Sequence, residues 1–467
     1  MKAFAFYIKE QSGQTQVIAI RKEVRLKRSL NMSRNYYLFL SGYFISSVGD
    51  WLYQLALPLL VYEITHSPLS MAVTYGLTFL PYIFFLPIGG VIADRVDRRR
   101  LLVFGDLTSA AVASLLAIAV WHGVQSMWLI YPAVFLLAGV LPLYHPAFQS
   151  FIPHIVHDDD LAKGNAWLQG SQNFVALIGP LISGVFIASI GATSAIFLDA
   201  LSFCISALLI IAIRIPSAPK LVINKAKSSC IADMREGFSF IWRHPVIRTG
   251  SLLFFGLNLA VTLFYSNYMY FLIEELKFTS FQLGFAVAIP GLGAVIGAIV
   301  APYFARRYQV GRLILGCTLI VGFMMLPLLF ARSVFSIAIP WAIVTALNTI
   351  SAVTWFTLRQ RIVPGLLLGR VVALTRLIAF TSIPIAAIAG GVLLNATRNI
   401  NVIIGIAAAV SILVGILGCF TPLYRSGQSR TDSAVVSEVV LNEVDRLSQG
   451  SDQSIAVVQK AASEIVT

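Results

Sequence analysis

Four polar side chains recur at helical spacing within the first long apolar segment of the sequence. Tyr43, Ser47, Asp50 and Gln54 follow one another at intervals of four, three and four residues, so a helix presents them on one face. A carboxyl group surrounded by hydrocarbon is rare and costly to ionise, which makes Asp50 a candidate for taking up and releasing a proton. The alternative is a structural salt bridge to a buried base.

Depth supports the first interpretation of Asp50. This residue lies about 12 positions into the apolar segment 38–62, which corresponds to roughly 18 Å of helix. The hydrocarbon core of a membrane is about 30 Å thick, so the carboxyl group lies near its middle. We predict that Asp50 is the main proton-coupling residue and that Asp199, about two turns from the outer end of a later apolar segment, is a second protonation site.

Three further apolar segments carry amide, hydroxyl and aromatic side chains at helical spacing. Such groups, with little charge among them, suit a bulky amphipathic substrate, including a cationic one. Each group alone is more often a contact between helices, so the prediction depends on four stripes converging on one cavity. Together with Tyr43, Ser47 and Gln54, the predicted cavity residues are Gln169, Asn173, Asn258, Thr262, Tyr265, Asn348 and Trp355.

The composition identifies the class of protein that must position these side chains. The chain is 58% hydrophobic and 12% charged, whereas soluble domains carry about 25% charged residues. It is therefore expected to be an integral membrane protein, and its net charge of +13 does not indicate nucleic acid. The four cysteines lie far apart without metal-ligand or redox spacing, and we expect them to be small packing residues.

Twelve segments of the sequence are long and apolar enough to be read as membrane-spanning helices. They predict an all-α integral membrane protein with two six-helix halves and a central site between the halves. The predicted spans are 38–62, 69–92, 101–122, 127–149, 165–189, 192–213, 250–273, 280–304, 312–331, 334–358, 369–394 and 399–422.

Lysine and arginine residues are distributed unequally between the two sides of the predicted spans. Of the 34 in the chain, only Lys277, Arg332 and Arg398 fall in outer loops, and Arg376 falls inside a span. Basic loops stay in the cytoplasm, so both termini are predicted to be cytoplasmic, in a bacterial inner or plasma membrane. The bilayer, with anionic head groups facing these loops, is an expected partner.

The same pattern predicts the domain organisation. Residues 1–31 are either a disordered extension or an overlong start, with Met32 as the alternative first residue, and the role of the C-terminal tail stays open. The predicted parts are a basic N-terminal extension (1–37), a first half (38–213), a cytoplasmic linker (214–249), a second half (250–422) and a polar tail (423–467).

The stretch GGVIADRVDRRR, residues 89–100, is a very short charged turn between two spans. Its order of Gly90, Asp94-Arg95 and Arg98-Arg99 resembles the signature loop between the second and third helices of the major facilitator superfamily of transporters. Asp97 stands where that family most often has glycine, a variant similar to the branch that includes macrolide-efflux proteins and an exporter of the siderophore enterobactin. The resemblance implies a conformational role for these residues, whereas the charges alone are equally consistent with a cytoplasmic anchor.

A second motif, GPLISG, contains Gly179, Pro180 and Gly184 and resembles the fifth-helix motif of antiporters in that family. Proline loosens the preceding helical turn, and the glycines leave a thin face for another helix. The alternative is ordinary membrane-helix packing. The fourth-helix arginine usual in the antiporter groups is missing, with Phe135 near its place, which puts proton coupling by that route in doubt.

Two other charges in the spans have more than one interpretation. Asp106 is expected to be a partner for the cluster Arg95 to Arg100, and Arg376 could pair with an acid or extend back to the cytoplasmic surface. The acidic, His-bearing loop that contains His154 is expected to be solvated and not to bind a metal, because nothing supplies a defined geometry.

Together with these features, the resemblance implies a secondary transporter that exports an amphipathic, macrolide-like compound in exchange for protons by alternating access. It is expected to be a monomer and to act on a small molecule, without a cofactor. No catalytic triad or nucleotide motif is present in the sequence, so an enzyme is not predicted. The alternatives are transport of a lysophospholipid or siderophore, and a non-transporting membrane sensor or scaffold.

Overall fold

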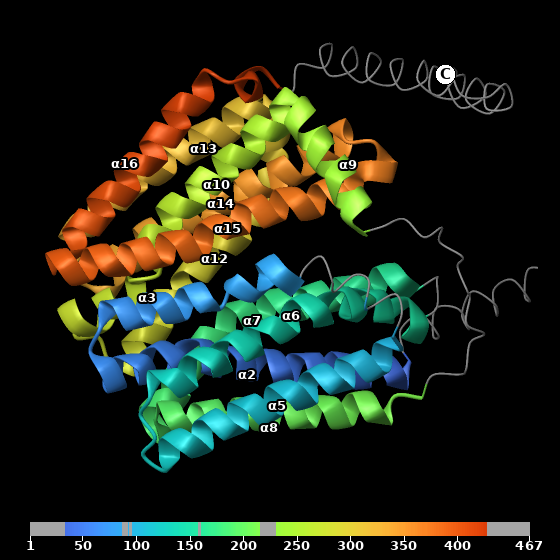
Figure 1. Ribbon diagram of the computed structural model, residues 1–467, viewed down its shortest axis with the longest axis vertical. Coiled ribbons are helices and arrows are strands. Elements are labelled where there is room, and N and C mark those ends of the chain that lie inside the picture. Colours follow the sequence, from blue (N-terminus) through green and yellow to red (C-terminus); the bar gives the residue numbers. More distant parts are fainter. Residues whose placement is uncertain (1–32, 86–91, 93–95, 157–159, 215–229, 427–467) are drawn as a thin grey trace, which may run out of the picture. The chain divides into compact units, whose positions relative to one another are not determined.

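Helices dominate the described part of the chain, which comprises residues 33–85, 92, 96–156, 160–214 and 230–426 of the computed structural model (Figure 1). Twelve helices among these residues are long and apolar enough to cross a membrane, which confirms the predicted all-α architecture. Helices suit this environment because lipid offers no hydrogen bonds, so each backbone group must be paired within its own segment.

Contacts divide the chain into two units, and unit 1 comprises Met1–Asn224 and Ser266–Ile289. Its helix α2 packs against α7 and α8, and α5 packs against α6 and α8. One hydrophobic cluster, which includes Tyr36, Phe39 and Phe151, closes one end of these helices. The helices are α2 (Arg34–Thr65), α3 (Pro68–Leu77), α5 (Arg98–Trp121), α6 (Met127–Ile155), α7 (Leu161–Ile190) and α8 (Ala192–Ala212).

Unit 2 comprises Lys225–Tyr265 and Pro290–Thr467. Its helix α10 packs against α15 and α16, and α13 packs against α14 and α16. A hydrophobic cluster that contains Ile247, Trp355 and Val371 lies between these helices. The helices are α9 (Cys230–Arg243), α10 (Pro245–Tyr265), α13 (Val310–Met325), α14 (Val334–Ile362), α15 (Gly365–Thr397) and α16 (Ile400–Cys419), with short 3₁₀ turns at Leu326–Phe330 and Pro422–Arg425.

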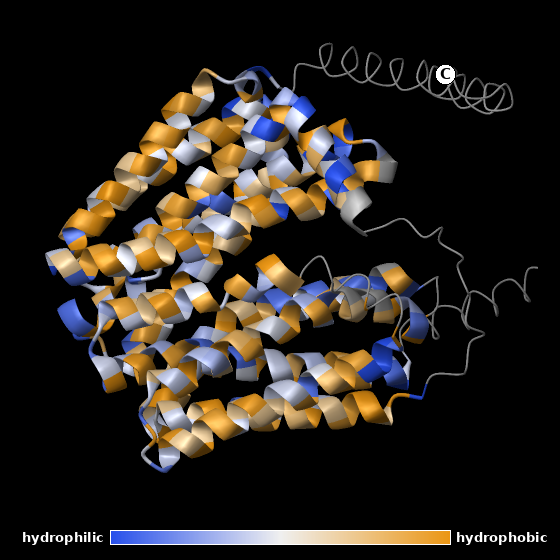
Figure 2. Cartoon of the chain, in the orientation of Figure 1, coloured by the Kyte–Doolittle hydropathy of each residue, from blue (hydrophilic) through white to orange (hydrophobic). Residues whose placement is uncertain are grey.

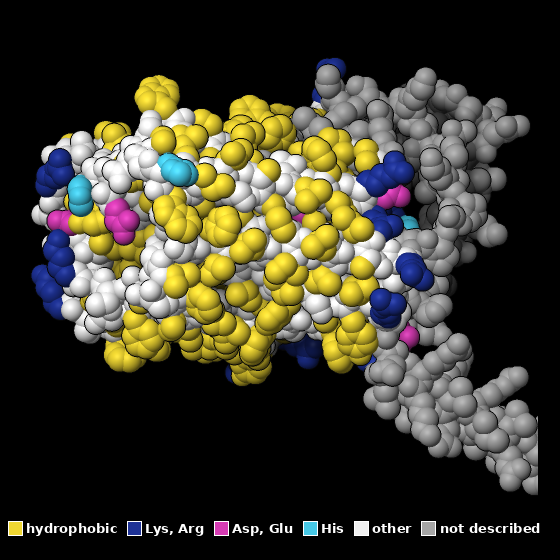
Figure 3. Space-filling model, turned by 90° about the horizontal axis from the view of Figure 1, so that it is seen from below, with side chains coloured by type: hydrophobic (Ala, Val, Ile, Leu, Met, Phe, Trp, Pro, Cys, Tyr) yellow, Lys and Arg dark blue, Asp and Glu magenta, His cyan; other side chains and the backbone are white. Residues whose placement is uncertain are grey.

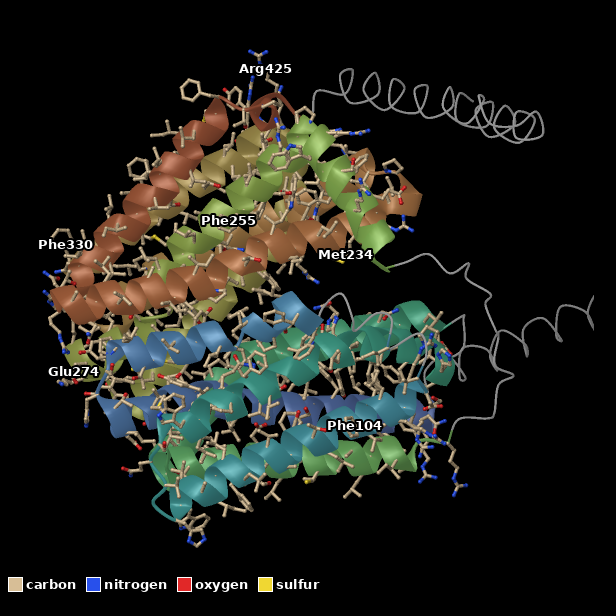
Figure 4. All side chains as sticks on the ribbon, in the orientation of Figure 1. Phe104, Met234, Phe255, Glu274, Phe330 and Arg425 are labelled. Atoms are coloured by element: carbon tan, nitrogen blue, oxygen red, sulfur yellow. The ribbon has the colours of Figure 1, made fainter. Side chains whose placement is uncertain are left out.

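The seventh span is interrupted where the chain passes from unit 2 to unit 1. After α10 it continues as α11 (Tyr268–Tyr270) and a π-helical turn (Phe271–Glu275), and α12 (Ser280–Arg307) follows. The Tyr62 hydroxyl of α2 donates a hydrogen bond to the Glu274 carboxylate, which is labelled in Figure 4. Lys277 pairs with the same carboxylate at 3.1 Å, so these contacts connect the segment after α10 to α2.

Several helices extend past the predicted ends of their spans, for example the fourth span, which continues from residue 149 to Ile155. The tenth span, predicted to end at residue 358, continues to Ile362 and therefore brings Arg359 into helix α14. The predicted linker contains α9, whose residue Ile241 is buried in the hydrophobic cluster of unit 2. Its apolar residues recur at helical spacing, so one side of α9 packs while polar residues remain outside.

The outer surface has the character expected for lipid contact. Large apolar side chains are exposed, including Trp128 at 89%, Phe330 at 81% and Phe420 at 85%. The helices are mostly hydrophobic along their length in Figure 2. On the face shown in Figure 3, hydrophobic side chains cover the middle while Lys and Arg gather mainly toward the two ends.

Candidate functional site

Three carboxylates from three helices of unit 1 come close enough to interact electrostatically. Asp50 of α2 interacts with Asp106 of α5 and with Asp199 of α8. Asp106 and Asp199 are 3% and 1% exposed, whereas Asp50 keeps partial exposure. The two acids proposed from the sequence therefore lie together, and Asp106 joins them as the third member of this acid cluster.

Small residues on α2 and α8 make this approach possible. A Cβ atom on Gly49 would lie 2.6 Å from Asp199 Oδ1, and one on Gly42 would lie 3.3 Å from Ser206 Oγ. Glycine at these two positions lets the helices approach closely, as is common at helix contacts in membranes. A side chain at position 49 would therefore push α2 away from α8 and separate the acids of this cluster.

Hydroxyl groups surround the two buried acids. Ser202 Oγ donates a 2.7 Å hydrogen bond to the Asp199 backbone carbonyl and lies 3.5 Å from Asp199 Oδ1. Ser206 and Tyr144 lie beside Asp106, although Asp106 Oδ2 has no hydrogen-bond partner within the usual distance. No ion pair joins any of the three acids to a base among the described residues.

The expected pairing of Asp106 with the arginine cluster stays a prediction, because Arg95 lies outside the described residues. Asp106 points to Ser206 and Tyr144, because it lies two turns along α5 on the face that packs against α6 and α8. Arg98 instead contacts the ring of His154, and Arg99 donates to the carbonyls of Ile210 and Ile211 at the end of α8.

The loop motif falls partly outside the described residues, which exclude Gly90, Asp94 and Arg95. Asp97, the departure from the usual pattern, has a local role because its carboxylate accepts a 2.9 Å hydrogen bond from the Arg100 backbone N–H at the start of α5. An aspartate suits this capping position because the first backbone N–H groups of a helix lack partners within the helix.

The fifth-helix motif makes close contacts within unit 1. A Cβ atom on Gly179 would overlap the Trp51 ring, and one on Gly184 would lie 2.8 Å from the Ser280 carbonyl and 3.1 Å from Gly284 Cα. The Pro180 carbonyl in turn faces Gly284. These glycines permit close packing of α7 with α2 and with the beginning of α12.

The other predicted cavity residues of unit 1 form two groups. The Tyr43 hydroxyl lies near Ser47 and Asp50, so these three share a face as predicted, and Gln54 is exposed further along α2. On α7, Gln169 Nε2 donates a 3.2 Å hydrogen bond to Asn173 Oδ1, and both side chains are exposed.

In unit 2 most of the predicted residues make contacts between helices. Asn258 Nδ2 donates a 3.1 Å hydrogen bond to the Ala379 carbonyl, and Tyr265 stacks on Trp341 at 5.7 Å between ring centroids. Thr262 is buried, and Asn348 has a buried amide oxygen without a hydrogen-bond partner. Trp355, 4% exposed and stacked on Phe254, belongs to the hydrophobic cluster of unit 2, so its observed role is packing.

Arg359 was not among the predicted site residues, because the sequence analysis assigned it to an inner loop. Arg359 is 8% exposed, and its guanidinium lies 5.3 Å from the centre of the Trp355 ring. Arg376, for which an acid partner or an extended conformation was expected, is exposed and lies 5.9 Å from the Phe380 ring. The sequence does contain a signal for such unpaired arginines, because no Asp or Glu occurs between residues 276 and 431.

Among the described residues, no group of three His, Cys, Asp or Glu side chains is arranged to hold a metal ion.

Comparison with known proteins identifies relatives along most of the chain. Residues 39–387 match the sequence profile of the Major Facilitator Superfamily. The multidrug efflux pump Tap of Mycolicibacterium fortuitum is 25% identical over 403 residues, which cover 83% of this chain and 96% of that protein. Macrolide efflux protein A of Streptococcus pyogenes is 26% identical over 239 residues, or 51% of this chain and 57% of that protein.

Solved structures show the same fold at low sequence identity. The nucleoside transporter NupG has a TM-score of 0.68 at 10% identity, covering 83% of this chain and 98% of that one. A bacterial homologue of the iron transporter ferroportin, in its inward-facing state, has a TM-score of 0.63 at 17% identity, covering 83% of this chain and 98% of that one. At these identities the likeness concerns the fold alone.

Proposed function

The chain belongs to the Major Facilitator Superfamily, in the efflux branch predicted from the sequence, and we propose that it exports an amphipathic, macrolide-like compound in exchange for protons by alternating access. It is a multi-pass membrane transporter for a small-molecule substrate. Its similarity to Tap and to macrolide efflux protein A supports the substrate class, because the name of each of those proteins describes efflux.

The observation that carries the coupling proposal is the position of Asp50. Asp50 as a residue keeps partial surface exposure, whereas Asp106 and Asp199 are almost completely buried. Two negative charges beside a third in a poorly hydrated region repel one another, and desolvation further favours protonation. A proton shared within the acid cluster can therefore enter and leave through Asp50, with Asp106 and Asp199 behind it.

A transport measurement tests this function. Full-length protein in liposomes with an acidic lumen is expected to accumulate radiolabelled erythromycin, with protons leaving as the drug enters. Asp50→Asn, which has nearly the same shape but cannot carry the proton, should reduce this accumulation to the level of protein-free liposomes, where only passive trapping of the basic drug remains. Counterflow without a pH gradient should persist in the variant, because substrate exchange needs no proton.

The matched control is Asp160→Asn, the same chemical change at the N-terminal end of α7, outside the acid cluster. It should leave gradient-driven accumulation unchanged. Undiminished accumulation in Asp50→Asn would refute the coupling scheme, and the absence of both accumulation and counterflow in the wild type would favour the sensor or scaffold alternative. A lysophospholipid and a catechol siderophore, supplied in the same assay, test the other substrate classes.

A further inference from the structure

Unit 2 contains a buried positive charge that the proposed proton exchange does not use. Arg359, in the last turn of α14, is 8% exposed. Its guanidinium lies 5.3 Å from the Trp355 ring centre and 5.8 Å from that of Phe356. One terminal nitrogen donates a hydrogen bond to Thr375 Oγ1 on α15, while Nε has no hydrogen-bond partner.

Among the described side chains of unit 2, no acid neutralises this charge. The sequence has no Asp or Glu from residue 276 to residue 431. The one acidic side chain that the structure describes in unit 2, Glu236 of α9, is paired with Arg370 at the surface. The charge that acts on Arg359 is a second cation, Arg376, which adds to the positive potential.

A buried guanidinium without a counter-ion is energetically unfavourable, because it loses hydration without gaining a carboxylate. Aromatic faces and a hydroxyl compensate only part of that loss. Arginine keeps its charge at neutral pH, so a missing proton cannot relieve the imbalance. The guanidinium geometry favours an oxyanion, which can accept two parallel N–H···O hydrogen bonds.

We propose that Arg359, supported by Thr375 and Arg376, is an oxyanion-binding site within unit 2 that accepts the phosphate, sulfonate or carboxylate group of an amphipathic molecule. The ring of Phe356, which is 45% exposed, offers apolar surface beside the charge for the hydrophobic part of such a molecule. The group can belong to a transported compound or to the head group of an anionic lipid. The site does not depend on proton coupling through Asp50, so a binding measurement tests it without any flux.

Thermal unfolding of the full-length protein in an uncharged maltoside detergent measures this binding. Decyl phosphate is expected to raise the Tm of the wild type in a saturable manner, whereas decyltrimethylammonium, with the same chain and the opposite charge, should not. Arg359→Gln should weaken the apparent affinity for decyl phosphate about tenfold or more, as expected for the loss of a charge-assisted pair. Arg359→Lys should retain an intermediate affinity, because the charge remains but the planar fork is lost.

Arg361→Gln is the matched control, since Arg361 lies on the same helix but is exposed. It should bind decyl phosphate as the wild type does. Equal affinities of Arg359→Gln and Arg361→Gln, or equal stabilisation by the cationic probe, would overturn the site. If the Arg359 variants do not fold, hydrogen exchange of the wild type decides: decyl phosphate should slow exchange in α15 around Thr375, and unchanged exchange there would also overturn it.

The source of the oxyanion is distinguished in nanodiscs. If a lipid head group occupies the site, phosphatidylglycerol raises the Tm relative to phosphatidylcholine in the wild type but not in Arg359→Gln, and it competes with decyl phosphate. If a soluble compound is the natural ligand, decyl phosphate binds equally in both lipids. Failure of proton exchange in the Asp50 experiment leaves these outcomes unaffected.

Discussion

The interiors of the two units hold opposite charges in different surroundings. Unit 1 brings three carboxylates together among glycines and serines, with Gly49 packed against Ser202 and Asp199. Unit 2 holds the Arg359 guanidinium against the rings of Trp355 and Phe356. Carboxyl groups need donors, which hydroxyls supply, whereas a cation is attracted to the negative face of an aromatic ring.

Each unit therefore tolerates charge in a poorly hydrated interior in its own way. A proton can neutralise the acids of unit 1, since their protonated form is the one that burial favours. Arg359 cannot be neutralised in this way, because it stays charged at neutral pH. It needs a ligand or counter-ion instead. The proposed roles follow this difference, with protons assigned to unit 1 and an oxyanion to unit 2.

The largest effect on stability is expected from Trp355→Ala in unit 2. Trp355 is 4% exposed and packs on Phe254 and Gly250, so its truncation should lower the free energy of unfolding by about 3–5 kcal/mol. Trp128→Ala, at an 89% exposed position, should change it by less than about 0.5 kcal/mol. Equal losses in detergent unfolding would show that the ring does not support the interior of unit 2.

The corresponding change in unit 1 is Gly49→Val. The added side chain would overlap Ser202 and Asp199, and such overpacking costs about 1–3 kcal/mol. Gly170→Val is the control, since a Cβ atom there meets nothing within 4 Å. Thermal unfolding of both variants measures the difference, and an unaffected Gly49→Val protein would contradict the close packing of α2 on α8.

Thr375→Asp would make unit 2 resemble unit 1 by placing a carboxylate beside Arg359. The new acid should occupy the guanidinium and weaken decyl phosphate binding about tenfold, or about 1.4 kcal/mol. Thr375→Asn, of nearly the same size but neutral, should weaken it much less. A titration followed by the Tm distinguishes them, and identical binding by both variants would show that Arg359 does not hold the ligand.

The smallest effect is expected for charges at the surface. Glu236 and Arg370 form an ion pair in which the side chains are 58% and 34% exposed, so Glu236→Gln should cost less than about 1 kcal/mol. The difference from the wild type should vanish at about 1 M salt, where screening is strong. A large, salt-independent loss would mean that α9 is held by more than this pair and its apolar face.

Much of the architecture could be predicted because long apolar segments have few alternatives to helices in lipid. The predicted spans match the helices within a few residues, and the largest differences come from polar residues at the ends. Arg359 was excluded from the tenth span because a charge suggested the end of the helix, yet α14 continues to Ile362. The face shared by Tyr43, Ser47 and Asp50 was predicted because all three lie on one helix, where spacing alone decides direction.

The twelve spans, the family and the costly carboxyl groups within apolar segments could be predicted from the sequence, because hydropathy and helical period are local properties. The neighbours of these side chains became known from the folded protein, in which Asp106 lies beside Ser206 and Tyr144 and Trp355 stacks on Phe254. The reason is physical: which faces meet depends on how closely α2, α5 and α8 approach, and that distance follows from side-chain volumes on several helices together.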